Sequence, residues 1–384
     1  MTLRSLLSPL VLAVAACGAS GSGTAQPSAQ NAGTTEGARP FTTAEVASFD
    51  DPWAISFIPG SGVPLTNQAL VTEKGGKLWL VDVATGKRQE VGGVPAVHVA
   101  GQGGLGDVVV HPDHAGNHRV YLSFVERGAD GTSGAAIGYG TLVFAGPAVP
   151  SGPVAAQLTD FKVIWRQDPK VDGNGHFSHR IAFAPDGTMF ISSGDRQKMQ
   201  PAQDRNVDLG KIIHLTAEGE RIDGRWYSMG HRNVLGLAFD AQGRLWNSEM
   251  GPKGGDEINL IAKGKNYGWP LASYGSHYDG ADIPDDHKGR GYEEPKVWWT
   301  PSISPAGLMI YKGTKFAGWT GDALVPALSG HALIRVDLDG DTARKGDQWE
   351  MGSRIRAVSE GPEGSVYLLE DGNPGRLLRL EPAG

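Results

Sequence analysis

The chain has 384 residues, of which 40% are hydrophobic and 20% charged, a composition typical of a globular protein that buries a sizeable core. Its net charge is −7 and it contains no run of Lys and Arg, so the sequence lacks the basic surface that a nucleic-acid partner requires. The 56 Gly, 24 Pro and 10 Trp residues favour many tight turns with aromatic packing between them. This pattern predicts an all-β fold of short strands.

Residues 1–17 are predicted to be a lipoprotein-type signal peptide. Residues 1–4 carry positive charge, and residues 6–16 form an apolar stretch that is too short to span a bilayer as a helix. Small residues precede Cys17, the only Cys of the chain, as at a bacterial lipoprotein processing site. A plain secretory signal is the alternative. We therefore expect an exported protein, periplasmic or at the cell surface, attached to the membrane only through lipid on Cys17.

Residues 18–40 consist mainly of small and polar residues, with almost no bulky apolar side chain. Such a segment cannot bury enough surface to fold, so we expect a flexible linker. The folded domain is predicted to span residues 41–384.

This domain carries a degenerate repeat made of a short apolar strand, a turn and a second apolar strand. Its copies begin at Trp53, Asp107, Ile181, Leu237, Gly307 and Ala357. Further apolar segments at residues 77–81 and 331–336 fit the outer strands of such units. A repeat of this kind predicts a six-bladed β-propeller with four-stranded antiparallel blades. A two-sheet sandwich is the alternative, which fits six similar units poorly.

Polar residues precede four of these copies. They are Gln102, His176, Arg232 and Arg354, before the second, third, fourth and sixth copies. Each residue taken alone could be structural, and the Gly-rich loop around Gln102 lacks the Lys and Ser/Thr of a phosphate-binding loop. Because equivalent positions of successive blades meet at one end of the central channel, we expect these four side chains to share a pocket.

His176 and Asp195 lie at the start and the end of the third copy, so a hairpin would bring them together. A carboxylate beside a histidine fixes its tautomer and raises its basicity, as a general base requires. A histidine in a β protein is more often structural, and the spacing alone does not decide between the two roles.

The remaining polar groups suggest an anionic ligand and a metal ion. Arg232 and Asn233 suit a planar ligand rich in oxygen atoms, and Arg354 and Arg356 share one strand face by their period of two. A solvated surface is the alternative for the two arginines. Residues 249–259 combine carboxylates with Gly and Pro carbonyls, the ligands that calcium prefers, although the spacing does not match an EF-hand. The chain offers no redox-active side chain for this pocket, so redox chemistry would need a cofactor.

Together these segments resemble the soluble PQQ-dependent aldose sugar dehydrogenase family. The resemblance runs in one order through residues 101–105, 176–180, 194–196, 230–233, 248–252, 256–260, 265–270, 299–303 and 354–356. It implies a six-bladed propeller that uses PQQ and Ca²⁺ to oxidise aldoses at C1 to the lactone. His176 would be the general base while hydride passes to PQQ, Asp195 would orient His176, and Arg232 would polarise the accepting carbonyl.

The resemblance also implies which residues hold the cofactors. The implied PQQ contacts are Gln102, Arg232, Asn233, Trp299, Ser302, Arg354 and Arg356. The carbonyls of Gly251 and Pro252 would bind the calcium of the cofactor, and Glu257 with the Tyr267 carbonyl would form a second, structural calcium site. Some family members grip PQQ with a Lys after the fifth copy, which residues 327–331 lack, so PQQ would bind more weakly or by the arginines alone.

Two other functions compete with this one. A calcium-dependent propeller lactonase or hydrolase needs several carboxylate or Asn ligands on the axis, where this sequence places Gln, His and Arg. A non-catalytic sugar-binding propeller would not need the predicted base. The expected partners are therefore an aldose substrate and an unidentified electron acceptor.

Overall fold

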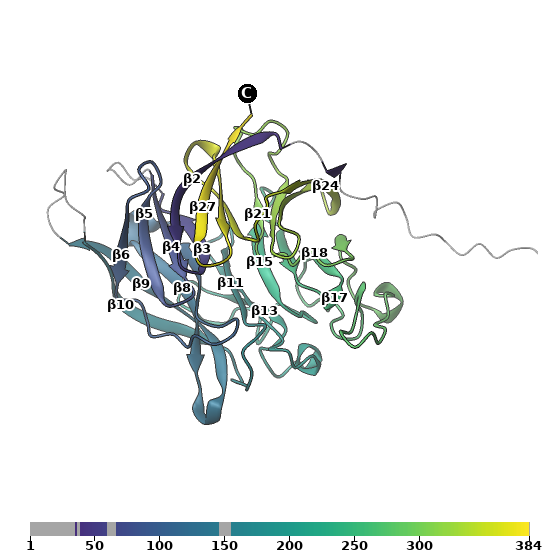
Figure 1. Ribbon diagram of the computed structural model, residues 1–384. Coiled ribbons are helices and arrows are strands. Elements are labelled where there is room, and N and C mark those ends of the chain that lie inside the picture. The colour runs from purple at the N-terminus through teal and green to yellow at the C-terminus, as the bar shows by residue number, and fades with distance from the viewer. Residues whose placement is uncertain (1–34, 37–38, 60–66, 146–154, 384) are drawn as a thin grey trace, which may run out of the picture.

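The structure is a computed structural model that describes residues 35–36, 39–59, 67–145 and 155–383 (Figure 1). The predicted signal peptide and most of the predicted linker lie outside the described residues. Helical structure in the described part is limited to short segments, which are α1 (His114–Asn117) and the 3-10 turns η1 (Ala129–Gly131), η2 (Gln200–Gln203), η3 (Lys288–Arg290) and η4 (Pro362–Gly364). No helix there is long and apolar enough to cross a membrane. The prediction of an all-β fold is confirmed.

The first sheet has eight strands in the order β3-β4-β5-β6-β10-β9-β8-β7. Its strands are β3 (Pro52–Phe57), β4 (Gln68–Glu73), β5 (Lys77–Asp82), β6 (Arg88–Gly92), β7 (Leu105–Val110), β8 (Arg119–Arg127), β9 (Ser133–Ala145) and β10 (Ala155–Arg166). Four consecutive antiparallel strands form each half. A short parallel pairing of Val91 with Ala156 and of Gly92 with Gln157 joins the halves at β6 and β10.

Two four-stranded antiparallel sheets follow along the chain. One contains β11 (Ser178–Phe183), β12 (Met189–Ser193), β13 (Lys211–Leu215) and β14 (Ser228–Met229). The other contains β15 (Val234–Phe239), β16 (Leu245–Glu249), β18 (Asp256–Ile261) and β20 (Val297–Trp299). A small ribbon of β17 (Lys253–Gly254) and β19 (Gly275–Ser276) lies in the connections that join β16 to β18 and β18 to β20.

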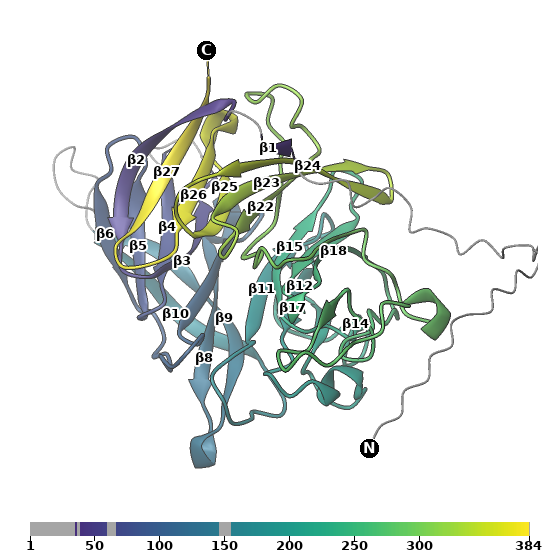
Figure 2. The same ribbon diagram turned by 45° about the vertical axis from the view of Figure 1, so that its right-hand side comes forward.

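The last two sheets take up both ends of the described chain. One contains β21 (Met309–Ile310), β22 (Ala323–Ala327), β23 (Ala332–Asp339) and β24 (Thr342–Glu350), with β1 (Thr35–Glu36) parallel to β24. The other contains β25 (Ile355–Glu360), β26 (Val366–Glu370) and β27 (Gly375–Pro382), and β2 (Phe41–Phe49) completes it antiparallel to β27 (Figures 1 and 2). A strand from the beginning of the domain thus covers the edge that its last strand would otherwise expose.

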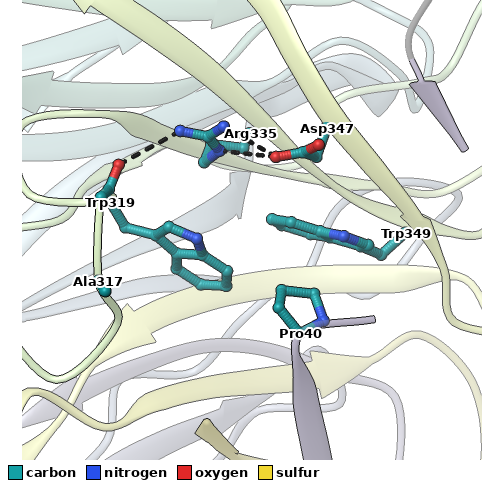
Figure 3. Close-up of a pocket in the computed structure, with 7 residues that line it drawn as sticks. Pro40, Ala317, Trp319, Arg335, Asp347 and Trp349 are labelled. Atoms are coloured by element: carbon teal, nitrogen blue, oxygen red, sulfur yellow. Dashed lines mark hydrogen bonds and ion pairs between the residues drawn. The ribbon is translucent and has the colours of Figure 1, made fainter. Parts of the chain in front are cut away.

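Aromatic packing secures this closure. Phe41 meets the rings of Trp319 and Trp349 edge-on, with centroids 6.1 and 5.3 Å away. A cavity of about 310 Å³ lies where Pro40 leads into β2, with both tryptophans in its wall (Figure 3). Arg335 and Asp347 also line this cavity, and Arg335 donates hydrogen bonds of 2.8 and 3.1 Å to the Asp347 carboxylate.

The innermost strands contact one another in the order β3, β7, β11, β15, β21 and β25, and β25 contacts β3 again. Residues of five of these strands, with Gly307 and Leu308 just before β21, enclose an axial cavity of about 150 Å³. Arg180 crosses this axis, donating to Asp107 Oδ1 at 3.1 Å and to the Leu235 and Ala306 carbonyls at 2.6 Å. Gln102, His176, Arg232 and Arg354 all precede inner strands, so they lie at the strand starts that surround one end of this axis.

Candidate functional site

His176 and Asp195 form the centre of the site. The β11–β12 hairpin pairs Ser178 with Ser193, and His176 and Asp195 lie two residues beyond that pair on either side. His176 Nδ1 and Asp195 Oδ1 are 2.7 Å apart, His176 is 7% exposed and Asp195 is fully buried. The prediction that the hairpin joins these two residues is confirmed.

The backbone of His176 is held in an uncommon conformation. Its φ is 47°, in the left-handed region that non-glycine residues rarely adopt and that is concentrated at functional sites. Gln102 Oε1 accepts a hydrogen bond of 2.7 Å from the His176 N–H. Gln102 thus lies in the pocket with His176, as its position before the second copy predicts.

The electrostatic environment keeps His176 neutral. Burial lowers the pKa of His176 below 6.5, the nearby Arg232 cation lowers it further, and Asp195 only partly opposes them. Asp195 makes Nδ1 the protonated nitrogen, and no described residue hydrogen-bonds to Nε2. The arrangement therefore supplies a neutral imidazole whose free nitrogen can accept a proton.

Asp195 is ionised because several donors surround it. Its carboxylate accepts from the backbone N–H groups of Gln197 and Met199 at 2.8 and 3.3 Å, and from Trp269 Nε1 at 2.8 Å. Burial acts to raise the pKa of Asp195, but the hydrogen bonds from His176, Trp269 and Gln197 outweigh it and hold this pKa below the usual value. The sequence did not predict this role of Trp269, because no local pattern indicates that a residue of a distant loop contacts Asp195.

Arg232 brings a buried positive charge to the same place. It is 5% exposed, and its guanidinium donates to the Met250 carbonyl at 3.0 Å and to Tyr278 Oη at 3.1 Å. It also lies over the Trp269 ring, 5.3 Å from the centroid. Within the described residues, no carboxylate forms an ion pair with this guanidinium. A buried cation without a counter-charge is costly, and an anionic ligand would compensate it.

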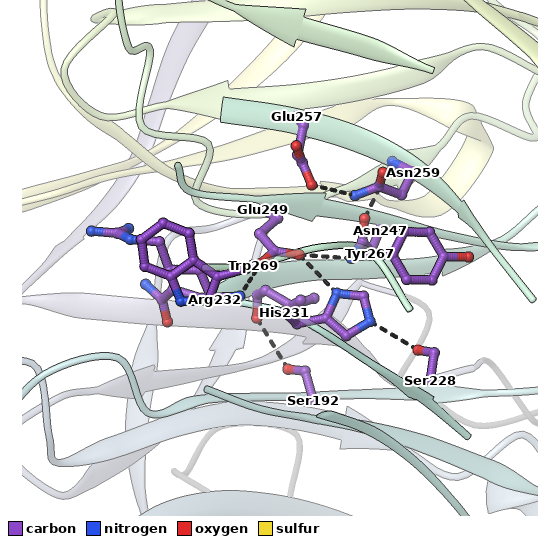
Figure 4. Close-up of polar contacts among 12 residues, drawn as sticks. Ser192, Ser228, His231, Arg232, Asn247, Glu249, Glu257, Asn259, Tyr267 and Trp269 are labelled. Atoms are coloured by element: carbon purple, nitrogen blue, oxygen red, sulfur yellow. Dashed lines mark hydrogen bonds and ion pairs between the residues drawn. The ribbon is translucent and has the colours of Figure 1, made fainter. Parts of the chain in front are cut away.

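A second buried network surrounds His231, the residue before Arg232 (Figure 4). Glu249 Oε2 is 2.9 Å from His231 Nδ1, and His231 Nε2 is 2.9 Å from Ser228 Oγ. The other Glu249 oxygen accepts the backbone N–H of Arg232. Because Ser228, His231 and Glu249 are almost completely buried, this set fixes the Arg232 backbone and is not open to a substrate.

Glu257 lies directly opposite Glu249 on the neighbouring strand. Burial raises the pKa of Glu257, and repulsion from Glu249 raises it further. Tyr267 stacks on His231 with ring centroids 4.8 Å apart, so the two residues predicted to bind the second calcium both border this network. Their role as metal ligands stays a prediction.

The loop around Gly251 and Pro252 is held by Asp256 and Ser302. Asp256 Oδ1 accepts the Gly251 N–H at 2.8 Å, and Ser302 Oγ lies 3.5 Å from the Pro252 carbonyl oxygen. Burial raises the pKa of Asp256 to about 6. Trp299, on β20, packs in the apolar cluster with Trp246 and Ile258, and its contact with a cofactor stays a prediction.

The remaining predicted residues are Asn233, Arg354 and Arg356. Asn233 Oδ1 accepts a hydrogen bond of 3.1 Å from Ser178, close to His176 in the chain. Arg354 Nε donates to one oxygen of Asp371 at 2.8 Å, and Arg356 donates to the other at 2.6 and 2.9 Å. The two arginines therefore lie together, as predicted, and share one carboxylate, a partner that the sequence did not reveal.

A family model described as glucose/sorbosone dehydrogenase matches residues 49–379. The chain belongs to the glucose/sorbosone dehydrogenase family. Aldose sugar dehydrogenase YliI of Escherichia coli strain K12 is 37% identical over 350 residues, which cover 87% of this chain and 90% of that protein. This glucose/sorbosone dehydrogenase homologue is therefore an oxidoreductase, as the sequence analysis predicts.

Solved structures of other family members share its architecture. The apo-form of the soluble aldose sugar dehydrogenase of Escherichia coli has a TM-score of 0.82 and 35% identity, covering 89% of this chain and 100% of that one. The PQQ-bound form of an aldose sugar dehydrogenase from Streptomyces coelicolor has a TM-score of 0.70 and 28% identity, covering 89% of this chain and 98% of that one.

The hydrogen bond between His176 Nδ1 and Asp195 links the titration of the imidazole to the charge of the carboxylate. Asp195→Asn removes the charge that raises the pKa of His176, so this pKa should fall further below 6.5, measured by NMR titration of the histidine ring protons. Asp223→Asn is the matched control, because Asp223 is 2.6 Å from His214 Nδ1 and does not contact His176. An unchanged or higher His176 pKa in Asp195→Asn would contradict this account.

Proposed function

We propose that the chain oxidises aldose sugars at C1 to the lactone, with PQQ and Ca²⁺ as cofactors and His176 as the general base. The observation that carries this proposal is a neutral, oriented His176 beside the unpaired Arg232 cation. The family assignment and the names of the relatives, which include quinoprotein glucose dehydrogenase B of Acinetobacter calcoaceticus at 25% identity, support the substrate class.

The charge balance of the site fits PQQ, a quinone that carries several carboxylates. Arg354 and Arg356 share Asp371, and Arg232 has no carboxylate partner among the described residues. Guanidinium groups bind carboxylates through paired hydrogen bonds. Arg232, Arg354 and Arg356 would therefore hold PQQ, with Gln102, Asn233, Trp299 and Ser302 as further contacts. When bound, PQQ supplies the oxidising quinone that the protein's own side chains lack.

The residues of the chain would act on the sugar as follows. His176 Nε2 accepts the proton of the C1 hydroxyl as the C1 hydrogen leaves with its electron pair and the carbonyl of the lactone forms. Asp195 retains the Nδ1 proton and stabilises the imidazolium that results. The Arg232 guanidinium would stabilise the negative charge that develops on the bound quinone, which is the oxidant of this step. The electron acceptor that later reoxidises the enzyme is a separate, unidentified partner.

Calcium would bind at two places in the site. The Gly251 and Pro252 carbonyls would bind the calcium that accompanies PQQ. Glu257 and the Tyr267 carbonyl would form the second site, where a cation would offset the repulsion between Glu257 and Glu249. Asn259 Oδ1 is buried beside Glu257 without a hydrogen-bond partner, and offers a further hard oxygen. The described residues hold no group of three or more His, Cys, Asp or Glu side chains suited to a metal, so backbone carbonyls would be essential.

We also propose that the domain is a six-bladed propeller with four-stranded blades. The closed ring of six inner strands supports six units, and each half of the eight-stranded sheet counts as one blade. The β6–β10 pairing then joins two blades at their outer edges. A calcium-dependent lactonase would need several free carboxylate or Asn ligands on the axis. Asp107, a carboxylate that lies there, is already paired with Arg180, which disfavours this alternative.

Reconstitution tests the activity. The chain without its first 17 residues, supplied with PQQ and Ca²⁺, should reduce a dye when aldoses are added. His176→Ala should lower the rate by about 10²–10⁴-fold, because it removes the base. His214→Ala, which breaks a similar His–Asp pair at Asp223, should leave the rate near that of the wild type. No aldose-dependent reduction by the wild type at saturating cofactor, or full activity of His176→Ala, would refute the proposal.

The second calcium site predicts a stability effect. In the absence of PQQ, Ca²⁺ should raise the unfolding temperature of the wild type, and Glu257→Gln should abolish that increase because the carboxylate ligand of the second site is lost. Without calcium, Glu257→Gln should be at least as stable as the wild type, since it removes the repulsion with Glu249. Glu370→Gln, a buried carboxylate paired with Arg376, should keep the calcium effect. An equal increase in Glu257→Gln would rule out this site.

We propose that the protein is exported and anchored by lipid on Cys17, at the periplasmic or cell-surface side of a membrane. Labelled fatty acid fed to expressing cells should enter the wild type but not Cys17→Ala, because the acceptor thiol is missing. Label in Cys17→Ala, or none in the wild type, would contradict lipid attachment at Cys17.

A further inference from the structure

Trp269 reaches the site from the long connection between β18 and β20. It is 6% exposed, and its backbone is fixed on both sides. The backbone N–H of Trp269 donates to the Gly230 carbonyl at 3.0 Å, and the backbone carbonyl of Trp269 accepts from Gln203 Nε2 at 2.6 Å. Its ring packs on Ala202 and Ile283. The position of the indole is therefore set by the loops around it.

The indole contacts both charged groups of the site. Its Nε1 donates to Asp195 Oδ2 at 2.8 Å, while the other Asp195 oxygen binds His176. The Arg232 guanidinium lies over the face of the same ring, 5.3 Å from the centroid. An indole offers a positive N–H edge to an anion and a negative face to a cation. Trp269 thus satisfies Asp195 and Arg232 at once.

This geometry keeps two opposite charges apart. Arg232 and Asp195 are neighbours, since the Asp195 N–H donates to the Arg232 carbonyl at 2.8 Å. A direct pair between their side chains would take the carboxylate from His176 and neutralise the cation that an anionic ligand needs. The indole gives Asp195 and Arg232 each a favourable contact, so that the two side chains do not pair with each other.

We propose that Trp269 is a positioning residue of the sugar oxidation, which keeps Asp195 directed at His176 and Arg232 directed at the cofactor. The inference rests on the proposed function and deepens it. The Trp269 N–H also withdraws negative charge from Asp195, and it contributes to the lowered pKa of that carboxylate. Without the N–H, the carboxylate would attract the His176 proton more strongly, so the pKa of His176 would rise.

Trp269→Phe removes the N–H and keeps an aromatic face for Arg232. The matched control is Trp246→Phe, because the buried Trp246 indole donates in the same way to Asp240 Oδ2 at 2.9 Å, away from His176. If Trp269→Phe does not fold, 3-benzothienylalanine at position 269 replaces it, since this residue keeps the bicyclic shape and lacks the N–H.

Two readouts test the proposal. In the enzyme without cofactor, NMR titration should give a higher His176 pKa for Trp269→Phe than for the wild type. In the reconstituted enzyme, kcat should fall by about 10-fold, the lower end of the loss seen when a group that orients a functional residue is removed. The acid limb of kcat/KM should also move to higher pH, because His176 must be neutral to act. Trp246→Phe should change neither the titration nor the limb.

A His176 titration and an acid limb in Trp269→Phe that both equal those of the wild type would overturn the proposal. The same shifts in Trp246→Phe would also overturn it, since they would reflect a general loss of buried hydrogen bonding. A wild type that oxidises no aldose refutes the proposed function instead, and it does so without any Trp269 variant. The two failures are therefore distinguishable.

Discussion

Arg232 is almost fully buried, and its side chain contacts the Met250 carbonyl, the Tyr278 phenol and the Trp269 ring. Burying a charge without a counter-charge costs several kcal/mol, and proteins retain such groups mainly where a ligand compensates them. The surrounding structure is built to keep this cation in place. Glu249 binds its backbone N–H, and Asp195 is held away from its side chain by an indole.

The same positive charge shapes the chemistry of His176. Together with burial it lowers the pKa of the imidazole, so that the ring is neutral where a carboxylate alone would favour its protonation. Asp195 then supplies orientation without making His176 permanently charged. A neutral imidazole and a buried cation lie close together because the sheets that begin with β11 and β15 present them from adjacent strand starts, on backbones that are separately fixed.

The sequence predicted those features that follow from a repeat. An apolar strand repeated six times indicates where strands begin, and the residues before β7, β11 and β15 identified Gln102, His176 and Arg232 as neighbours. A hairpin needs no long-range information, so the pairing of His176 with Asp195 could be predicted from spacing. The resemblance to a family implied PQQ, which no pattern in the chain could have done.

Other features depend on contacts between segments that are distant in sequence. Trp269 approaches Asp195 from 74 residues away, and Asp371 joins Arg354 and Arg356 from the far side of a hairpin. Arg180, which crosses the axis, was part of a sequence motif with no predicted contacts. In the structure it binds Asp107 on β7, Leu235 on β15 and Ala306 in the connection before β21. Tertiary packing decides such contacts, and no local periodicity encodes it.

A crystal structure of the protein with PQQ and Ca²⁺ would show whether the buried Arg232 cation binds the cofactor. We expect the quinone to lie against Arg232, its carboxylates to contact Arg354 and Arg356, and His176 Nε2 to face the space left for the sugar. PQQ bound elsewhere, or an Arg232 side chain that turns away from it to pair with Asp195, would show that this cation does not hold the cofactor.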